Sequence, residues 1–281
     1  MNRNLRPTLL ALALLMATAG AAPPDDPKPG PTPRPPTVFL VGDSTVRNGS
    51  GRGGQGLWGW GDFLADHLDP ARAGVANRAL GGRSSRTYLT EGLWEKVEAD
   101  LRPGDVVLIQ FGHNDGGPVD TGRARASLKG SGDESKDVVV QATGQPETVR
   151  TYGWYLKRYI AGARAKGATP VVLSPVPRNI WSADGQVVAR ASKDYGRWAA
   201  EAAKAGDAPF VDLNEIVAAR YEADGRDKVA SAYFTPADHT HTTEAGARLN
   251  AACVAEGLRG LRDGLLAAAL RPALGASPTP R

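Results

Sequence analysis

The stretch Val38-Phe-Leu-Val-Gly-Asp-Ser-Thr-Val46 is a short apolar run that ends abruptly in Gly-Asp-Ser. An apolar run of this length, rich in β-branched and aromatic residues and closed by Gly42-Asp43, predicts a buried strand. Such a strand would deliver Ser44 to the carboxyl edge of a sheet, where open α/β sheets bind their ligands. Ser44 is therefore a candidate nucleophile, and the alternative is a serine that caps the following segment.

Apolar runs and helical stretches alternate along the rest of the chain. Further strands are expected at 74–79, 105–111, 169–174 and 210–212, and helices at 57–68, 92–100, 148–166, 187–205, 215–223 and 243–261. This alternation implies right-handed βαβ units and a parallel sheet that is covered on both faces. The sequence therefore predicts an α/β fold, a three-layer α/β/α sandwich with about five parallel strands.

Residues 116–146 interrupt this pattern with a polar stretch of Gly, Ser, Asp, Lys and Arg. Long loops in compact domains are usually functional or mobile, and this one follows a strand end beside Ser44's expected position. We favour a lid or substrate wall over a neutral insertion.

The two ends of the chain have compositions that differ from its centre. Residues 1–21 place Arg3 and Arg6 before an apolar run and small residues after it, the layout of a secretory signal peptide too short to span a bilayer. Residues 22–36 contain eight prolines and predict an extended linker. We expect the protein to be exported and released, to the extracellular space or the periplasm. We also expect one folded domain at 37–265 and a tail at 266–281.

Composition limits the possible partners. The chain has 281 residues and a net charge of +4, and no cluster of Lys and Arg is interleaved with aromatics, which argues against nucleic-acid binding. The single Cys253 cannot form an intrachain disulfide and is expected to be buried. The central region is large enough to bury its own core, and we expect a monomer that is not inserted in a membrane.

The second chemistry-bearing segment is Asn77-Arg-Ala-Leu-Gly-Gly-Arg-Ser-Ser-Arg86, which follows the second expected strand. Paired glycines let the backbone approach a ligand closely, so Gly82 could direct its N–H toward an oxyanion; a plain tight turn is the alternative. Arg83 and Arg86 are candidates to contact an anionic substrate, or they solvate the loop.

The third segment, Phe111-Gly-His-Asn-Asp115, closes the next expected strand. Asn114 carries an amide donor that could complete an oxyanion hole, and the alternative is a turn stabilised by its own Asn and Asp side chains. His113 is either a supporting group or an exposed loop residue, and we do not assign it as the base.

The fourth segment, Ala237-Asp-His-Thr-His-Thr-Thr-Glu-Ala-Gly246, precedes the last expected helix. Asp238 and His241 are three residues apart, on one side of a helical turn, so the carboxylate can reach the ring and fix its tautomer. We assign His241 as the general base ahead of His239, which would point elsewhere. Two histidines and a carboxylate are also metal-ligand types, but the helical spacing and further ligands are missing. We predict neither a metal nor a cofactor.

Together the four segments resemble the SGNH/GDSL hydrolase superfamily. Its defining residues are a Ser in a Gly-Asp-Ser block, a Gly, an Asn and an Asp-x-x-His, and these match Ser44, Gly82, Asn114 and Asp238 with His241 in the same order. The resemblance implies a flavodoxin-like fold without a metal and a Ser44-His241-Asp238 triad. It also implies an oxyanion hole formed by Ser44, Gly82 and Asn114.

A narrower resemblance is to rhamnogalacturonan acetylesterases. The matching features are Gly-Asp-Ser-Thr-Val, the Asn-x-Ala-x-x-Gly-Arg-Ser block ending at Ser84, Gly-His-Asn-Asp and Asp-His-Thr-His-Thr. This resemblance implies removal of acetyl groups from pectic polysaccharides. From the residues of the second segment, Arg83 is our candidate substrate contact. The rivals are another acyl esterase of the superfamily, of the acetyl xylan esterase, lipase or thioesterase type, and a non-catalytic glycan-binding protein.

Overall fold

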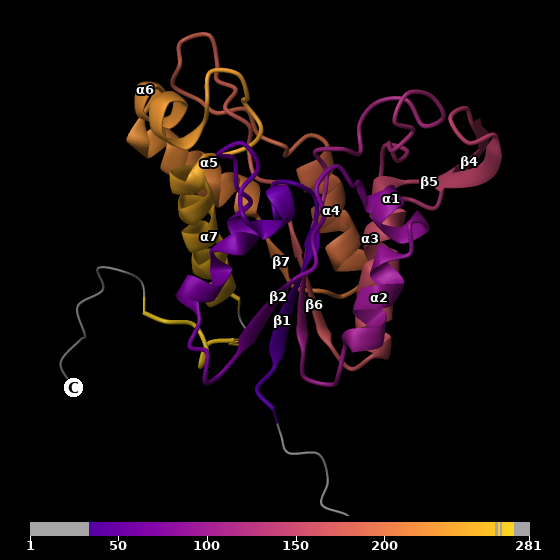
Figure 1. The fold of residues 1–281 in the computed structure, drawn as a ribbon, viewed down its shortest axis with the longest axis horizontal. Helices are drawn as coiled ribbons and strands as arrows, with labels where there is room; N and C mark the ends of the chain where they lie inside the picture. Colours follow the sequence, from indigo (N-terminus) through magenta and orange to yellow (C-terminus); the bar gives the residue numbers. More distant parts are fainter. Residues whose placement is uncertain (1–33, 262–263, 265, 273–281) are drawn as a thin grey trace, which may run out of the picture. The chain divides into compact units, whose positions relative to one another are not determined.

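All the strands expected from the sequence lie side by side in one sheet of the computed structural model, which describes residues 34–261, 264 and 266–272. They are β1 (Thr37–Gly42), β2 (Gly74–Asn77), β3 (Val106–Gln110), β6 (Thr169–Leu173) and β7 (Phe210–Val211). Their order across the sheet is β2-β1-β3-β6-β7, and every neighbouring pair is parallel (Figure 1). All five carboxyl ends therefore meet at one edge.

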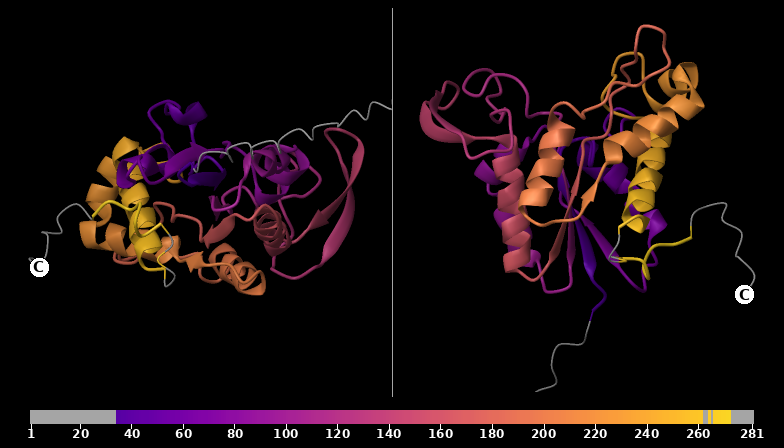
Figure 2. Two further views of the ribbon diagram at one scale, coloured as in Figure 1. Left: turned by 90° about the horizontal axis from the view of Figure 1, so that it is seen from below. Right: turned by 180° about the vertical axis from the view of Figure 1, so that it is seen from behind.

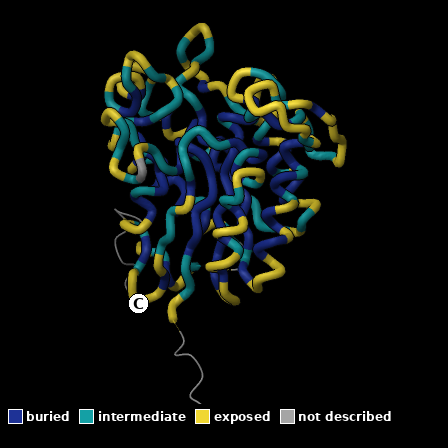
Figure 3. Tube along the Cα trace, turned by 45° about the vertical axis from the view of Figure 1, so that its right-hand side comes forward, coloured by how far each residue is buried: buried dark blue, intermediate teal, exposed yellow. Residues whose placement is uncertain are grey.

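The central strands are apolar throughout because both of their faces are covered. Phe39 and Val41 of β1 belong to one buried cluster, whereas Val38 and Leu40 belong to the other. Successive side chains of a strand point to opposite faces, so one unbroken apolar run serves two cores. Figure 3 shows these strands as a buried centre with exposed loops around them.

Helices form the two outer layers (Figures 1 and 2). On one face lie α1 (Ser85–Thr90), α2 (Leu93–Asp100), α3 (Tyr152–Ala165) and α4 (Tyr195–Ala205). On the other lie α5 (Leu213–Asp224) and α7 (Glu244–Arg259), with the short α6 (Arg226–Lys228) and a π-helical turn at Val229–Tyr233 between them in sequence. The predicted three-layer α/β/α sandwich is confirmed.

The helix predicted at 57–68 is wrong. This segment holds only the short 3-10 turns Trp60–Asp62 and Leu64–His67. The N–H groups of Trp60 and Gly61 donate to the carbonyls of Thr45 and Val46 instead of to their own helix. A Cβ on Gly59 would lie 2.2 Å from the backbone of Val46, so the segment packs directly against the turn that carries Ser44.

The polar stretch 116–146 is not simply a loop, because it contains half of a hairpin. Antiparallel strands β4 (Ser135–Val140) and β5 (Gln145–Arg150) pair beyond α1 and α3. As a result α3 begins at Tyr152, capped by the Thr151 side chain, and not at the predicted residue 148. Similarly, α4 begins only after Asp194, although a helix was predicted from residue 187.

The expected signal peptide and almost all of the expected linker lie outside the described residues. At the other end, residues assigned to the tail still pack, because Leu270 forms a β-bridge with Leu68 and Ala269 is buried. Cys253 is buried within α7, as predicted. None of the helices in the described ranges has the length and apolar character needed to cross a membrane.

Candidate active site

Ser44 lies on a tight turn directly after β1, at the carboxyl edge of the sheet. The carbonyl of Asp43 accepts a hydrogen bond from the N–H of Arg47 at 3.0 Å, which closes the turn. A Cβ on Gly42 would lie 2.5 Å from the carbonyl oxygen of Gln110, so only glycine fits where β1 and β3 approach. The turn leaves Ser44 largely buried but with its hydroxyl directed at a histidine.

Ser44, His241 and Asp238 form one hydrogen-bonded chain. Ser44 Oγ lies 2.7 Å from His241 Nε2, and His241 Nδ1 lies 2.7 Å from Asp238 Oδ2. Because a carboxylate only accepts, Nδ1 carries a proton, and in the neutral tautomer that this selects, the Nε2 lone pair faces the serine hydroxyl. This is the arrangement of a nucleophile, its base and the group that orients the base.

Asp238 meets His241 through a turn and not through the helical spacing that the sequence suggested. Asp238 Oδ1 accepts the N–H groups of Thr240 and His241 at 2.7 and 2.9 Å, so the loop folds around the carboxylate. Burial alone would raise the pKa of Asp238, but these hydrogen bonds, together with the one from the ring, lower it below its usual value. Asp238 therefore remains ionised beside the imidazole.

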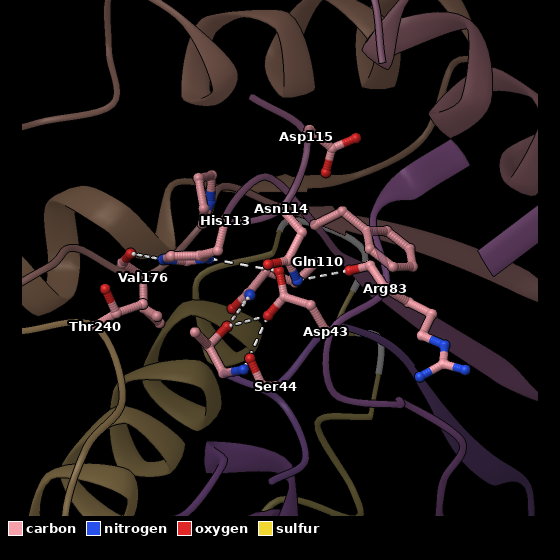
Figure 4. Close-up of polar contacts among 12 residues, drawn as sticks. Asp43, Ser44, Arg83, Gln110, His113, Asn114, Asp115, Val176 and Thr240 are labelled. Atoms are coloured by element: carbon pink, nitrogen blue, oxygen red, sulfur yellow. Dashed lines mark hydrogen bonds and ion pairs between the residues drawn. The ribbon is translucent and has the colours of Figure 1, made fainter. Parts of the chain in front are cut away.

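The two remaining histidines near the site have different surroundings. His239 is exposed, and its side chain makes no hydrogen bond or ion pair within the described part of the chain. His113 is buried, with Nε2 at 3.0 Å from the carbonyl of Val176 and Nδ1 at 3.5 Å from Asp43 Oδ2. The supporting role foreseen for His113 fits this position behind the Ser44 turn (Figure 4).

A buried polar chain that sequence reasoning missed holds this turn. Gln110 Nε2 donates to Thr45 Oγ1 at 2.7 Å, and Gln110 Oε1 accepts from the indole N–H of Trp60 at 2.8 Å. Thr45 Oγ1 donates in turn to Asp43 Oδ1 at 2.8 Å. The available signal was a glutamine at the end of an otherwise apolar strand, since a buried amide needs partners for both of its ends.

Three donors are available for an oxyanion beside Ser44. The N–H groups of Ser44 and Gly82 make no hydrogen bond to another atom of the described residues. Gly82 has a φ of +79°, and a Cβ on Gly81 would lie 3.5 Å from Ser44 Cβ, so this loop lies against the serine. Asn114 Nδ2 donates one hydrogen to the carbonyl of Arg83 at 2.9 Å, which leaves its second hydrogen available.

Arg83 and Arg86 both form ion pairs. Arg83 bonds Glu91 at 2.9 Å, and Figure 4 shows its side chain extending away from Ser44. Arg86 is buried and forms a two-pronged pair with Glu147, at 2.6 and 2.7 Å. Both sequence interpretations of Arg86, substrate contact and loop solvation, are therefore wrong, because it is a structural residue.

Asp115 joins the site to the polar stretch that follows it. Its carboxylate accepts from the hydroxyls of Ser85 and Ser127, at 2.5 and 3.1 Å, and from the Ser85 N–H. Burial raises the pKa of Asp115 to about 6 despite these bonds.

In the described ranges, no three His, Cys, Asp or Glu side chains are grouped so that they could share a metal ion.

A cavity of about 170 Å³ opens beside His113. Its wall is formed by the loop after β6 and by the start of α4, including Pro175, Arg178, Ile180 and Tyr195. The cavity is therefore adjacent to the strand end that carries Asn114.

The chain belongs to the GDSL-like Lipase/Acylhydrolase family, whose sequence profile matches residues 40–249 and so includes all four segments. It is accordingly a carboxylic ester hydrolase, and the resemblance to the SGNH/GDSL superfamily is confirmed.

Within this family, the chain is similar to individual proteins that are named as rhamnogalacturonan acetylesterases. A rhamnogalacturonan acetylesterase of Emericella nidulans is 35% identical over 75% of this chain and 79% of its own. A probable rhamnogalacturonan acetylesterase of Bacillus subtilis, YesY, is also 35% identical, over 80% of this chain and 93% of its own. Among solved structures, YxiM of Bacillus subtilis matches with a TM-score of 0.64 at 22% identity, covering 80% of this chain and 56% of that one. The last likeness concerns the fold alone.

Proposed function

We propose that this protein is an exported serine esterase that removes O-acetyl groups from plant cell-wall polysaccharide, with the rhamnogalacturonan of pectin as its substrate. The observation that carries the proposal is the chain Ser44–His241–Asp238, with 2.7 Å at each step and unused N–H donors beside the serine. The two relatives named as rhamnogalacturonan acetylesterases, at 35% identity, support the choice of substrate.

In the first half of the reaction, Ser44 Oγ attacks the acetyl carbonyl carbon while His241 Nε2 takes the hydroxyl proton. Asp238 stabilises the imidazolium that forms. The N–H groups of Ser44 and Gly82 and the Asn114 amide bind the oxyanion. His241 then gives its proton to the departing sugar oxygen, and the acetyl group remains on Ser44.

In the second half, water attacks the acetyl-serine carbonyl and His241 takes a proton from the water. The oxyanion is bound by the same donors, and collapse of the intermediate breaks the bond to Ser44 Oγ. His241 returns the proton to Ser44 Oγ, and acetic acid leaves and loses its remaining proton to water. No group beyond those of the chain and water is needed for the proton balance.

The triad is tested with Ser44→Ala and His241→Ala on 4-nitrophenyl acetate. Each variant should lower kcat by roughly 10⁴-fold or more, since triad members act as a unit. Ser192→Ala and His239→Ala are matched controls at exposed positions, and both should retain wild-type turnover. Near wild-type turnover by S44A or H241A, with circular dichroism showing a folded protein, would refute the mechanism.

The substrate is tested by measuring acetate release from acetylated rhamnogalacturonan, other acetylated pectin and acetylated xylan. We expect the highest kcat/KM on rhamnogalacturonan. Equal rates on all three would contradict the narrow assignment, and a preference for longer acyl esters would favour a lipase-type acyl hydrolase. Glycan binding without acetate release would favour a non-catalytic protein.

Export is proposed from the composition of residues 1–21. Expression of the full chain in a bacterial host, followed by N-terminal sequencing of the protein outside the cytoplasm, should give a start close to residue 22. Retention of an intact Met1 terminus in the cytoplasm would contradict export.

A further inference from the structure

Two arginines stand at the rim of the candidate site and are held there by backbone and hydroxyl oxygens. Arg178 donates from Nη2 to the carbonyl of His113 at 3.3 Å and from Nε to Thr240 Oγ1 at 3.2 Å. Arg125 donates from Nη1 to the carbonyl of Gly82 at 3.1 Å. Their partners therefore belong to the segments that carry Asn114, His241 and the glycine turn.

Sheet order places these two arginines on different sides of the serine. Gly82 lies in the loop that follows β2, and His113 lies in the loop that follows β3. Ser44 follows β1, which lies between β2 and β3 in the sheet. A chain of sugars that presents an acetyl group to Ser44 could therefore meet Arg125 on one side and Arg178 on the other.

Neither of these half-buried arginines is held in an ion pair within the described residues, because Asp43 and Asp115 attract Arg125 only from beyond ion-pair distance. By contrast, Arg83 is neutralised by Glu91 and Arg86 by Glu147. A guanidinium that bonds only neutral oxygens retains donors whose planar geometry suits a carboxylate.

The surroundings of Arg178 provide space for a sugar. Arg178 lines the cavity of about 170 Å³ beside His113, and Tyr195 and Ile180 form part of the same wall. Pockets that bind polar ligands usually combine an aromatic side chain with a charged group, here the guanidinium. Asp194, also in the wall, already accepts the N–H of Tyr195 at 2.6 Å.

We propose that Arg178, with Arg125 on the other side of Ser44, forms an anion subsite that binds the carboxylates of uronic acid residues next to the acetylated sugar. The inference rests on the proposed function, because it assumes a polysaccharide substrate. It assigns recognition of negative charge to two residues outside the four family segments. It also explains how Arg83, the candidate substrate contact within those segments, can be committed to Glu91.

The subsite is tested by comparing Arg178→Gln and Arg125→Gln with two matched controls, Arg83→Gln and the exposed Arg158→Gln of α3. Acetate release is measured on acetylated rhamnogalacturonan and on the same polymer after carbodiimide reduction of its carboxylates. R178Q should lower kcat/KM on the charged polymer about 10- to 100-fold more than on the reduced polymer, the worth of a hydrogen bond to a charged group. R125Q should act in the same direction, and Arg178→Lys should restore part of the loss.

A second measurement needs no polysaccharide turnover. Unacetylated oligogalacturonate should inhibit 4-nitrophenyl acetate hydrolysis by the wild type, with an inhibition constant that rises about tenfold or more in R178Q. Equal inhibition of R178Q and wild type, an equal loss on both polymers, or the same loss in R83Q would each overturn the subsite. Failure of the proposed function would give a different result, namely no acetate from any polysaccharide by the wild type.

Discussion

His113 lies between a backbone carbonyl and a buried carboxylate. Val176 offers only a carbonyl oxygen to Nε2 at 3.0 Å, so Nε2 must donate. Nδ1 lies 3.5 Å from Asp43 Oδ2, and neither of these two atoms has a hydrogen-bond partner among the described residues. Burial alone would raise the pKa of Asp43, but His113 and the Thr45 hydrogen bonds lower it. The buried contact between His113 and Asp43 therefore supports the turn that carries Ser44.

Replacing His113 by Leu should destabilise the protein by about 3–5 kcal/mol, because it leaves the Asp43 charge buried and unpaired. The free energy of unfolding in urea measures the loss. The double variant D43N/H113L should recover part of it, and the cycle gives the coupling between the two groups. A cost below about 1 kcal/mol for H113L would mean that the pair is not charged.

Asn114→Ala should lower kcat on 4-nitrophenyl acetate by about 10²–10³-fold with little change in KM, because the amide acts on charge that develops only in the transition state. Steady-state kinetics separates the two parameters. A raised KM at unchanged kcat would assign Asn114 to ground-state binding instead, and would leave Ser44 and Gly82 as the oxyanion donors.

At the scale of the elements, Arg86 fastens the polar stretch to the body of the fold. From α1 it pairs with Glu147 of β5 and donates to the carbonyls of Val119 and Ala126, at 2.7 and 2.9 Å. Four bonds from one buried guanidinium thus join a helix, a hairpin and the loop that carries Arg125. This explains why a segment so polar in sequence has a defined course.

Arg86→Met should destabilise the protein by about 3–5 kcal/mol, since Glu147 loses its buried partner. Hydrogen exchange should rise in residues 116–150 more than in the central strands. The solvent-exposed pair between Arg248 and Glu244 provides the control, because R248M should cost less than about 1 kcal/mol. Equal changes in hydrogen exchange across the whole chain would contradict the inference that Arg86 stabilises residues 116–150 locally.

The central strands could be predicted from sequence because burial on both faces gives an unbroken apolar run, as in 38–41 and 106–109. The four chemistry-bearing segments could be placed because parallel strands bring their carboxyl ends together. The 57–68 segment could not be predicted, because the sequence does not show that Gly59 and Gly61 pack against Val46. The hairpin was missed because its strands carry exposed charged residues such as Lys136 and Asp137 and show little apolar alternation.

For the whole molecule, the buried Asp115 and the half-buried Asp62 make one contribution to how stability depends on pH. The lowered pKa values of Asp43 and Asp238 act in the opposite direction. Burial raises the pKa of Asp115, and likewise that of Asp62, to about 6. An acid whose pKa is higher in the folded state binds its proton more tightly there. Its protonation therefore stabilises the folded state, and this contribution is fully present below about pH 4. That contribution is lost as the pH rises from about 4 to 6.

Asp115→Asn should remove the share of this dependence that Asp115 causes. Between pH 4 and 6.5 the wild type should lose up to about 3 kcal/mol of unfolding free energy relative to D115N. Urea unfolding at both pH values gives the difference. A difference that stays constant with pH would mean that the hydrogen bonds from Ser85 and Ser127 keep the carboxylate ionised throughout.

The burial of Cys253 has a practical consequence for spectroscopy. It is the only cysteine in the chain, it is 1% exposed, and burial raises the pKa of its thiol to about 12. Maleimide reagents attack thiolates, so the native chain should remain unlabelled. A single cysteine introduced at the exposed Thr143, in the turn between β4 and β5, would therefore take one fluorophore without removal of the natural thiol. Its emission would report directly on whether the hairpin moves while a polymer is being deacetylated.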